Sequence, residues 1–217
     1  MNALPPPLGR PVQRKLVPPV GNDVVDLGDN ETQLDQLHPR FLQRVFTKLE
    51  GHRILSSTDS RVSLWGHWAA KESVYKAARK RNPSLPFAHS SFVVEDWEDA
   101  AAESFTGRIA HEGWDYWVDV ARTSDWLHAV ALPLDSKNAE PKLVDGVEVC
   151  PEELDASTAV RLFACARLAK ELGCDPDQLT ITRTWPPLLL CEGRSTGVDI
   201  SLSHHGRWLA FAAVLPG

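Results

Sequence analysis

Apolar residues recur every three to four positions along residues 64–81, LWGHWAAKESVYKAARKR, and this period predicts an amphipathic helix. Trp65, Trp68, Glu72 and Lys76 fall on one face of that helix. A carboxylate on a face with two tryptophans is unfavourable unless a cation or a metal ion compensates its charge. The pattern therefore leaves two interpretations, a surface Glu72–Lys76 ion pair or a carboxylate that belongs to a functional site.

Further along the chain, apolar alternation and short β-branched runs predict strands separated by turns. The expected strands cover residues 20–27, 104–111, 114–121, 126–132, 179–182 and 188–191, and residues 197–216 form strand, tight turn and strand. Two further segments with apolar residues at helical spacing, 38–54 and 155–173, predict helices, and Gly173 marks the end of the second. Long helices combined with antiparallel hairpins indicate an α+β fold.

The two ends of this pattern resemble each other. Residues 116–132 can be laid without gaps on residues 198–214, so that Trp126 meets Trp208. A long helix precedes each of these hairpins. We therefore expect a duplicated unit, in which a long helix packs on an antiparallel sheet.

The same pattern divides the chain into four parts. Residues 1–20 are rich in proline and predict an extended arm. Residues 21–133 form the first half and residues 151–217 the second half. Residues 134–150 are polar and charged, and we interpret them as a linker.

Two short motifs beside the helix carry a recognisable pattern. Residues 68–76 give W-x-x-K-E-S-x-x-K, in which Lys71 precedes Glu72, and the first strand contains Gly21-Asn22-Asp23. Aspartate is unfavourable in strands, so Asp23 either ends the strand or is functional. The helix motif closely resembles the signature helix of the 4'-phosphopantetheinyl transferases, which move the pantetheine arm of coenzyme A to a serine of a carrier protein. The G-x-D strand and Phe46-Thr47-x-x-Glu50 resemble the same family.

This resemblance implies a fold and an order of elements. The larger, Sfp-type members are pseudodimers with one catalytic site between their two halves. In them the half with an S-H-S-G-like turn comes first, whereas here Ser203-His204-His205-Gly206 lies near the end of the chain. The halves are therefore expected in permuted order, as in a fused dimer of short family members.

The resemblance also implies the chemistry. A serine of an apo acyl or peptidyl carrier protein would attack the β-phosphate of coenzyme A and release 3',5'-ADP. The family motifs assign Asp23 and Glu72 as magnesium ligands, and Asp26 is a candidate third ligand. The base is either Glu72 or a metal-bound water, and Lys76 is a second candidate catalytic residue.

The remaining assignments concern coenzyme A. His204 matches the family's phosphate-binding histidine, with Ser203 beside it, and Lys71 and Arg161 are candidate contacts to phosphate or pantetheine. A histidine in a hairpin or an arginine on a helix is commonly just exposed to solvent. These assignments therefore depend on the resemblance.

Three positions depart from the family pattern. Val25 replaces the second carboxylate of the Sfp-type motif G-x-D-x-E, His205 replaces the serine of the turn, and Trp185-Pro186-Pro187 stands where that type has G-K-P. Trp185 could therefore replace the adenine contact by stacking. Val25 favours an alternative function, a non-catalytic relative that binds coenzyme A or a carrier protein. A structural protein with a tryptophan-rich surface is a further alternative, although the tryptophans on apolar patterns are better explained as core.

Composition argues against several other classes of protein. The formal net charge of −6 argues against a nucleic-acid binder and provides no general attraction to acidic carrier proteins. No apolar run approaches the length of about 18 residues that would suggest a membrane span, and no signal peptide is apparent, so we expect a cytoplasmic protein without a membrane partner. The four cysteines have no C-x-x-C spacing, which argues against a metal cluster or a disulfide framework.

Overall fold

The computed structural model describes residues 17–86, 88–101, 104–137 and 141–217. The first part of the chain contains β1 (Gly21–Asp26), α1 (Phe41–Val45), α2 (Lys48–Ser56), α3 (Ser60–Arg81), β2 (Val93–Ala101), β3 (Ser104–His111), β4 (Trp114–Arg122) and β5 (Trp126–Pro133). The second part contains α4 (Leu134–Lys137), β6 (Lys142–Val149), α5 (Ala156–Leu172), β7 (Leu179–Ile181), β8 (Leu188–Cys191), β9 (Arg194–His205) and β10 (Trp208–Leu215). Short 3₁₀ helices lie at Asn30–Thr32, Leu34–Gln36, His89–Ser91 and Pro176–Gln178.

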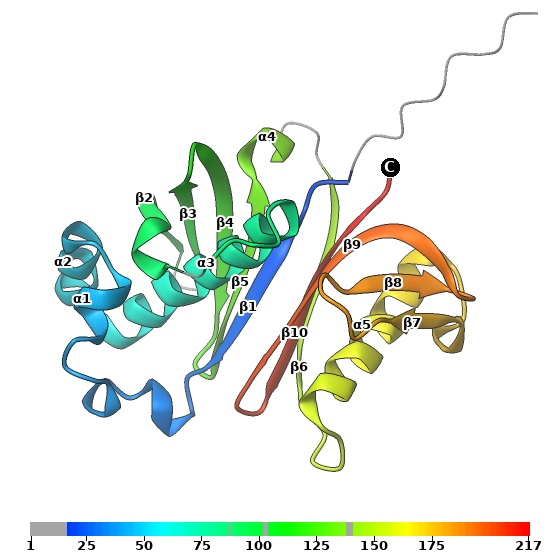
Figure 1. Cartoon of the computed structure of the whole chain (residues 1–217). Helices are drawn as coiled ribbons and strands as arrows, with labels where there is room; N and C mark the ends of the chain where they lie inside the picture. The colour runs from blue at the N-terminus through cyan, green and yellow to red at the C-terminus, as the bar shows by residue number, and fades with distance from the viewer. Residues whose placement is uncertain (1–16, 87, 102–103, 138–140) are drawn as a thin grey trace, which may run out of the picture.

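The strands form two antiparallel sheets of five strands each. Their orders are β1-β5-β4-β3-β2 and β6-β10-β9-β8-β7, so the first strand of each sheet lies at an edge beside the last. Figure 1 shows the sheets side by side, with β1 (blue) next to β9 and β10 (orange to red). The predicted α+β class, with a long helix packed on each antiparallel sheet, is confirmed.

The two long helices begin and end at residues with clear capping roles. The Asp59 side chain accepts a hydrogen bond from Val62 N (3.0 Å) at the start of α3, and Asp155 does the same for Thr158 N (3.0 Å) at α5. Gly173 ends α5 with φ of +67°, which glycine adopts without strain. Each helix packs its apolar side on its own sheet, which gives each half a separate core. None of the helices in the described ranges is long and apolar enough to cross a membrane.

The segment expected as one helix over residues 38–54 is instead two helices, α1 and α2. The break falls at Thr47, whose side chain accepts a hydrogen bond from Glu50 N (3.3 Å), while Glu50 Oε2 accepts one from Thr47 N (2.6 Å). This reciprocal capping box starts α2. A threonine followed three residues later by glutamate is the sequence signal for such a start.

The prediction that residues 134–150 are a linker is wrong for most of that segment. Lys142–Val149 forms β6, which pairs along its whole length with β10 from Lys142–Leu215 to Val149–Trp208. The polar composition suggested a linker because β6 is an edge strand with several exposed side chains. Its backbone still gains a complete set of antiparallel partners, which side-chain polarity does not reveal.

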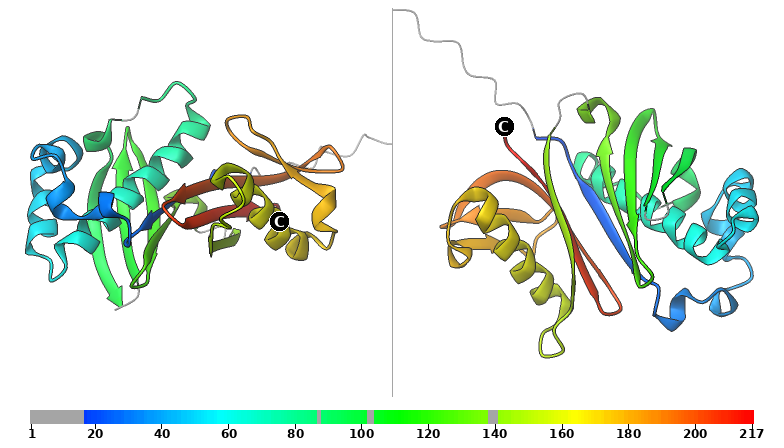
Figure 2. Two further views of the ribbon diagram at one scale, coloured as in Figure 1. Left: turned by 90° about the horizontal axis from the view of Figure 1, so that it is seen from below. Right: turned by 180° about the vertical axis from the view of Figure 1, so that it is seen from behind.

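The two sheets meet through a ladder of side chains between β9 and β1. Every second residue of β9 supplies an acceptor: Asp199 Oδ1 for Val20 N (2.8 Å), Ser201 Oγ for Asn22 N (3.1 Å), Ser203 Oγ for Asn22 Nδ2 (3.0 Å) and His205 Nδ1 for Asp26 N (3.0 Å). These bonds satisfy N–H groups on the edge of β1 that faces away from β5. A small apolar cluster that includes Val130 and Val214 completes the contact, and Figure 2 shows from two sides how closely the sheets approach.

Candidate active site

Gly21 allows β1 to lie directly against α3. A Cβ atom at this position would overlap the backbone oxygen of Ser73 and would come within 2.8 Å of Ala77 N. Because both atoms belong to the helix backbone, they cannot move aside as a flexible side chain can. The glycine of the G-x-D motif therefore sets the short distance between the strand and the helix, and it brings Asp23 beside the middle of α3.

Asp23, Glu72 and Lys76 meet at this contact between β1 and α3. Lys76 Nζ lies 2.8 Å from Asp23 Oδ1 and also donates to Asn22 O (2.9 Å). The side chains of Lys76 and Asp23 are only 19% and 15% exposed, so the pair is largely shielded from solvent. The structure therefore brings together the three residues expected at the site, and Lys76 bonds Asp23 across the contact.

The charge state of Glu72 reflects these surroundings. Burial, followed by the neighbouring charge of Asp23, raises the pKa of Glu72 to about 7, and Lys76 opposes this shift. Two carboxylates in one partly buried place repel each other unless a cation lies between them. Carboxylate oxygens are the ligands that magnesium prefers, and magnesium typically needs only one or two from the protein, with waters and phosphates completing its coordination.

His204 from the second half lies close enough to Lys76 and to Arg161 for their charges to affect its protonation. Partial desolvation, followed by the charges of Lys76 and Arg161, lowers the pKa of His204. His204 comes from the end of β9, and Arg161 from α5, where its guanidinium donates to Ser157 Oγ (2.8 Å). Residues separated by about 130 positions in the sequence thus share one electrostatic environment.

Two other residues singled out in the sequence lie in the second half. Ser203 is buried, and its hydroxyl accepts the bond from Asn22 in the ladder, so its observed role is to join the halves. Trp185, which is 42% exposed, lies under the guanidinium of Arg79 at 4.9 Å from the ring centroid. Because Arg79 belongs to α3, this contact connects the second half to the helix that carries Glu72.

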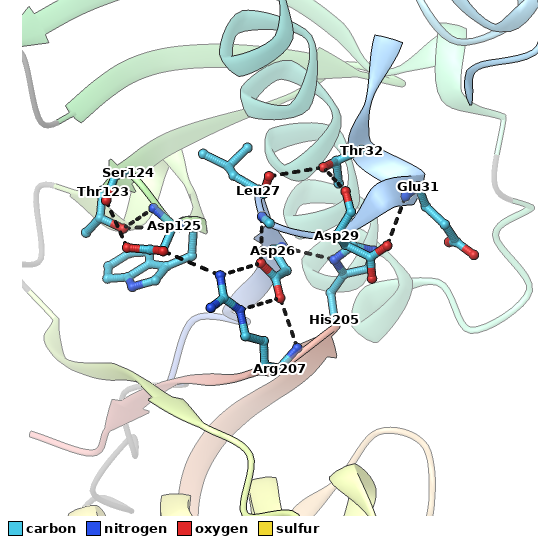
Figure 3. Close-up of polar contacts among 12 residues, drawn as sticks. Asp26, Leu27, Asp29, Glu31, Thr32, Thr123, Ser124, Asp125, His205 and Arg207 are labelled. Carbon is cyan, nitrogen blue, oxygen red and sulfur yellow. Dashed lines mark hydrogen bonds and ion pairs between the residues drawn. The ribbon is translucent and has the colours of Figure 1, made fainter. Parts of the chain in front are cut away.

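Asp26 does not join Asp23 and Glu72. Its buried carboxylate accepts a bond from Gly28 N (2.8 Å). It also accepts bonds from Arg207 N (3.0 Å) and Arg207 Nε (3.1 Å), and Figure 3 shows Arg207 beside it. Within the described residues, no group of three or more His, Cys, Asp or Glu side chains is placed to hold a metal ion. The prediction of Asp26 as a third ligand is therefore wrong, because Arg207 and backbone amides occupy its oxygens.

Lys71 also has a different role from the one predicted. It is fully buried and its Nζ lies 2.8 Å from Glu50 Oε2, with further bonds to Val45 O and His89 O (3.2 Å each). Glu50 Oε1 in turn accepts from Val94 N (2.7 Å). This buried pair ties α2 and β2 to α3, so the prediction that Lys71 contacts coenzyme A is wrong.

Sequence reasoning missed Glu50 and Arg207 as partners of the motif residues. Glu50 had a signal, because it ends the F-T-x-x-E element that the family resemblance had already singled out. Arg207 had none, since its partner Asp26 lies 181 positions away and neither residue belongs to a periodic pattern.

Comparison with known proteins agrees with this geometry. A model of the 4'-phosphopantetheinyl transferase superfamily matches residues 19–131, slightly more than half of the chain, including Asp23 and all of α3. The chain therefore belongs to this superfamily, and the predicted family is confirmed.

Two similar proteins are both named holo-[acyl-carrier-protein] synthase. The one from Gloeobacter violaceus is 42% identical over 59 residues, which cover 27% of this chain and 45% of that protein. The one from Chlorobaculum tepidum is 28% identical over 120 residues, which cover 53% of this chain and 95% of that protein. The chain thus spans less than half of the first relative and nearly all of the second.

Proposed function

We propose that this protein transfers the 4'-phosphopantetheine arm of coenzyme A to a serine of an apo acyl or peptidyl carrier protein. The serine oxygen forms a bond to the β-phosphorus, and the bond from that phosphorus to the bridging oxygen breaks. The leaving group is 3',5'-ADP, and the serine proton passes to a base. The observation that carries the proposal is the meeting of Asp23, Glu72 and Lys76 at the contact between β1 and α3.

Asp23 and Glu72 are the residues that would hold magnesium. The fit rests on their proximity and on the raised pKa of Glu72, which burial causes first and the neighbouring charge of Asp23 second. A bound magnesium ion would neutralise negative charge on the pyrophosphate and at the phosphorus under attack. Glu72 is also placed to receive the serine proton when it is ionised.

The cations around the cleft would position coenzyme A. Lys76 lies beside the carboxylate pair, and His204 and Arg161 are further candidate cations from the second half. Together they would attract and orient the phosphates, which is most of what a protein must do in phosphoryl-type transfer. Trp185 offers an exposed aromatic face for the adenine, in place of the missing G-K-P motif.

A non-catalytic binding relative is the competing function, and Val25 favours it. Val25 is 2% exposed and belongs to the core of the first half, so no carboxylate occupies that position of the Sfp-type motif. The two functions differ in turnover but not in coenzyme A binding.

The deciding experiment mixes the protein with coenzyme A, magnesium and a panel of apo-carrier proteins, and measures intact carrier mass. We expect a mass increase of one phosphopantetheine that chelation abolishes. Glu72→Gln should remove turnover, whereas Glu148→Gln, an exposed control on β6, should keep it. Binding of coenzyme A without any mass increase across the panel would favour the binding relative.

A further inference from the structure

The turn between β9 and β10 is fastened to the end of β1 by one buried carboxylate. Asp26 Oδ2 accepts from both the backbone N (3.0 Å) and Nε (3.1 Å) of Arg207, and Oδ1 lies 3.3 Å from Arg207 Nη2. Arg207 Nη2 also lies 3.4 Å from Asp125 Oδ1 in the turn between β4 and β5. Figure 3 shows Arg207 between these two acids, with the Asp26 side chain directed at the turn. We call this set, Asp26, Arg207 and Asp125, the clasp.

Two glycines allow the backbone around the clasp to pack closely. Gly206 has φ of +53°, and a Cβ atom there would lie 2.5 Å from Asp26 Oδ2. A Cβ atom at Gly28 would lie 2.6 Å from Arg207 Nη2. Glycines at both positions therefore let the turn and the end of β1 approach until the carboxylate reaches the backbone amide of Arg207.

The clasp lies immediately beside the histidine of the proposed site. Consecutive residues of a strand point to opposite sides, so His204 and His205 face in different directions. His205 Nδ1 accepts a bond from Asp26 N (3.0 Å), which leaves His204 on the side where Lys76 and Arg161 act on it. Holding His205 and Arg207 on β1 therefore fixes the direction of His204.

We propose that Asp26 and Arg207 are positioning residues, which hold the β9–β10 turn on β1 so that His204 is presented to coenzyme A. The inference rests on the proposed function for its kinetic consequences, but the placement of His204 can be measured without it. Asp26 thus serves the site through the turn and not as a ligand. This role accounts for a buried acid whose cationic partner among the described residues, Arg207, comes from the other half of the molecule.

Arg207→Ala should release the turn and raise KM for coenzyme A about tenfold, the effect of losing one charge-assisted hydrogen bond, with kcat nearly unchanged. If Arg207 acts through His204, the same substitution in a His204→Ala background should raise KM less than about twofold. Arg194→Ala is the matched control, because Arg194 is exposed at the opposite end of β9. Effects of Arg207→Ala and His204→Ala that multiply would overturn the proposal.

A second measurement does not depend on turnover. The His204 ring signals in the NMR spectrum of the ligand-free protein should shift in Arg207→Ala, and the pKa of His204 should rise towards the ordinary value for histidine as the ring gains solvent and moves away from the charges of Lys76 and Arg161. Arg207→Lys, which keeps the charge but loses the two-pronged contact, should give a smaller shift. Unfolding midpoints, measured for each variant, identify any that fail to fold.

Unchanged His204 signals in a folded Arg207→Ala variant would overturn the positioning role, whether or not the protein transfers phosphopantetheine. A wild-type protein that neither binds coenzyme A nor modifies a carrier would overturn the proposed function, while the NMR result would still decide the positioning role. The two failures are therefore distinguishable.

Discussion

The two halves of the molecule share one frame but only one of them carries the acidic site. Their strand orders are identical, and equivalent backbone bonds close them, Leu27 N to Asp125 O and Cys150 N to Arg207 O, both at 2.8 Å. Trp126 and Trp208, which occupy equal places in the repeat, meet with ring centroids 6.1 Å apart. These paired contacts support a duplicated unit and show where the halves diverge.

The divergence is clearest at the position of Asp23. Asp23 pairs with Ala129, whereas in the second half Gly146 pairs with Phe211, and Ala129 and Phe211 occupy equal places in the repeat. A Cβ atom at Gly146 would lie 3.1 Å from the ring of Phe163 on α5 and 3.3 Å from Phe211. Aromatic side chains thus fill the place that the carboxylates occupy in the first half. We infer that the second half contributes His204 and Arg161 to a site whose acids come from the first half alone.

The first test of this comparison between the two halves substitutes Gly21 and Gly146. Gly21→Ala should destabilise the protein by about 5 kcal/mol or prevent folding, because the new methyl group meets the helix backbone of α3. Gly146→Ala should cost only about 1–3 kcal/mol, since the rings of Phe163 and Phe211 can shift. Urea denaturation of both variants provides the measurement. Equal losses would mean that the strand and helix are no closer in the first half than in the second.

The second test concerns how each helix is anchored. Lys71→Met should lower the free energy of unfolding by about 3–5 kcal/mol, because it leaves the buried Glu50 carboxylate without its cation. Lys170→Met, at an exposed position in the last turn of α5, should change it by less than about 0.5 kcal/mol. Thermal and urea unfolding check both values. A tolerated Lys71→Met would show that the ion pair does not hold α2 and β2 on α3.

The local elements and the main acidic residues could be predicted from the sequence because their signals are local. The period of residues 64–81 predicted the helix that carries Glu72, and the family resemblance of the G-x-D and K-E motifs implied that Asp23 and Glu72 meet. The role of Lys71 could not be predicted, because a helical period shows on which face of the helix a side chain lies but not which residue it contacts. Its partner, Glu50, lies on a separate helix, and only the packed structure shows that the ion pair is fully buried from solvent.

Asp26 and β6 show a second limit of sequence reasoning. Asp26 lies three residues after Asp23, and this spacing suggested that both residues bind the same metal ion. The carboxylate of Asp26 instead binds Arg207, which lies 181 positions away in the sequence. In β6 the backbone pairing with β10 determines the structure, while the polar side chains of an edge strand resemble those of a linker. Both predictions failed because contacts between residues far apart in the sequence produce no periodic pattern in it.

The third test concerns the pKa of Glu72, a feature of the first half. The pKa of Glu72 rises from 4.5 to about 7 on folding, so between these pH values the folded protein retains a proton that the unfolded chain releases. The free energy of unfolding should therefore fall as pH rises through this window. Glu72→Gln should remove this loss and should be more stable than wild type at pH 8 by roughly 2–3 kcal/mol, allowing for partial exposure.

Urea denaturation at several pH values checks this expectation, and the two proteins should be equally stable near pH 4. Excess magnesium should stabilise wild type at pH 8 but not Glu72→Gln, since the metal competes with the proton for the carboxylate. A constant difference between the proteins at all pH values would show that Glu72 does not titrate with the raised pKa.

The smallest expected effect compares His204 with Arg122, which occupies the equal place in the repeat. His204→Ala should raise KM for coenzyme A by about tenfold, or about 1.4 kcal/mol, because a phosphate contact serves the ground state and the transition state alike. Arg122 lies at the end of β4, with its guanidinium 5.4 Å from the centroid of the Phe105 ring. Among the described contacts the Arg122 guanidinium lies over this aromatic ring, so Arg122→Ala should change KM less than about twofold. Initial rates at varied coenzyme A concentration measure both variants. Equal increases in KM would mean that both turns serve coenzyme A, and the single-site interpretation of the duplicated frame would then be wrong.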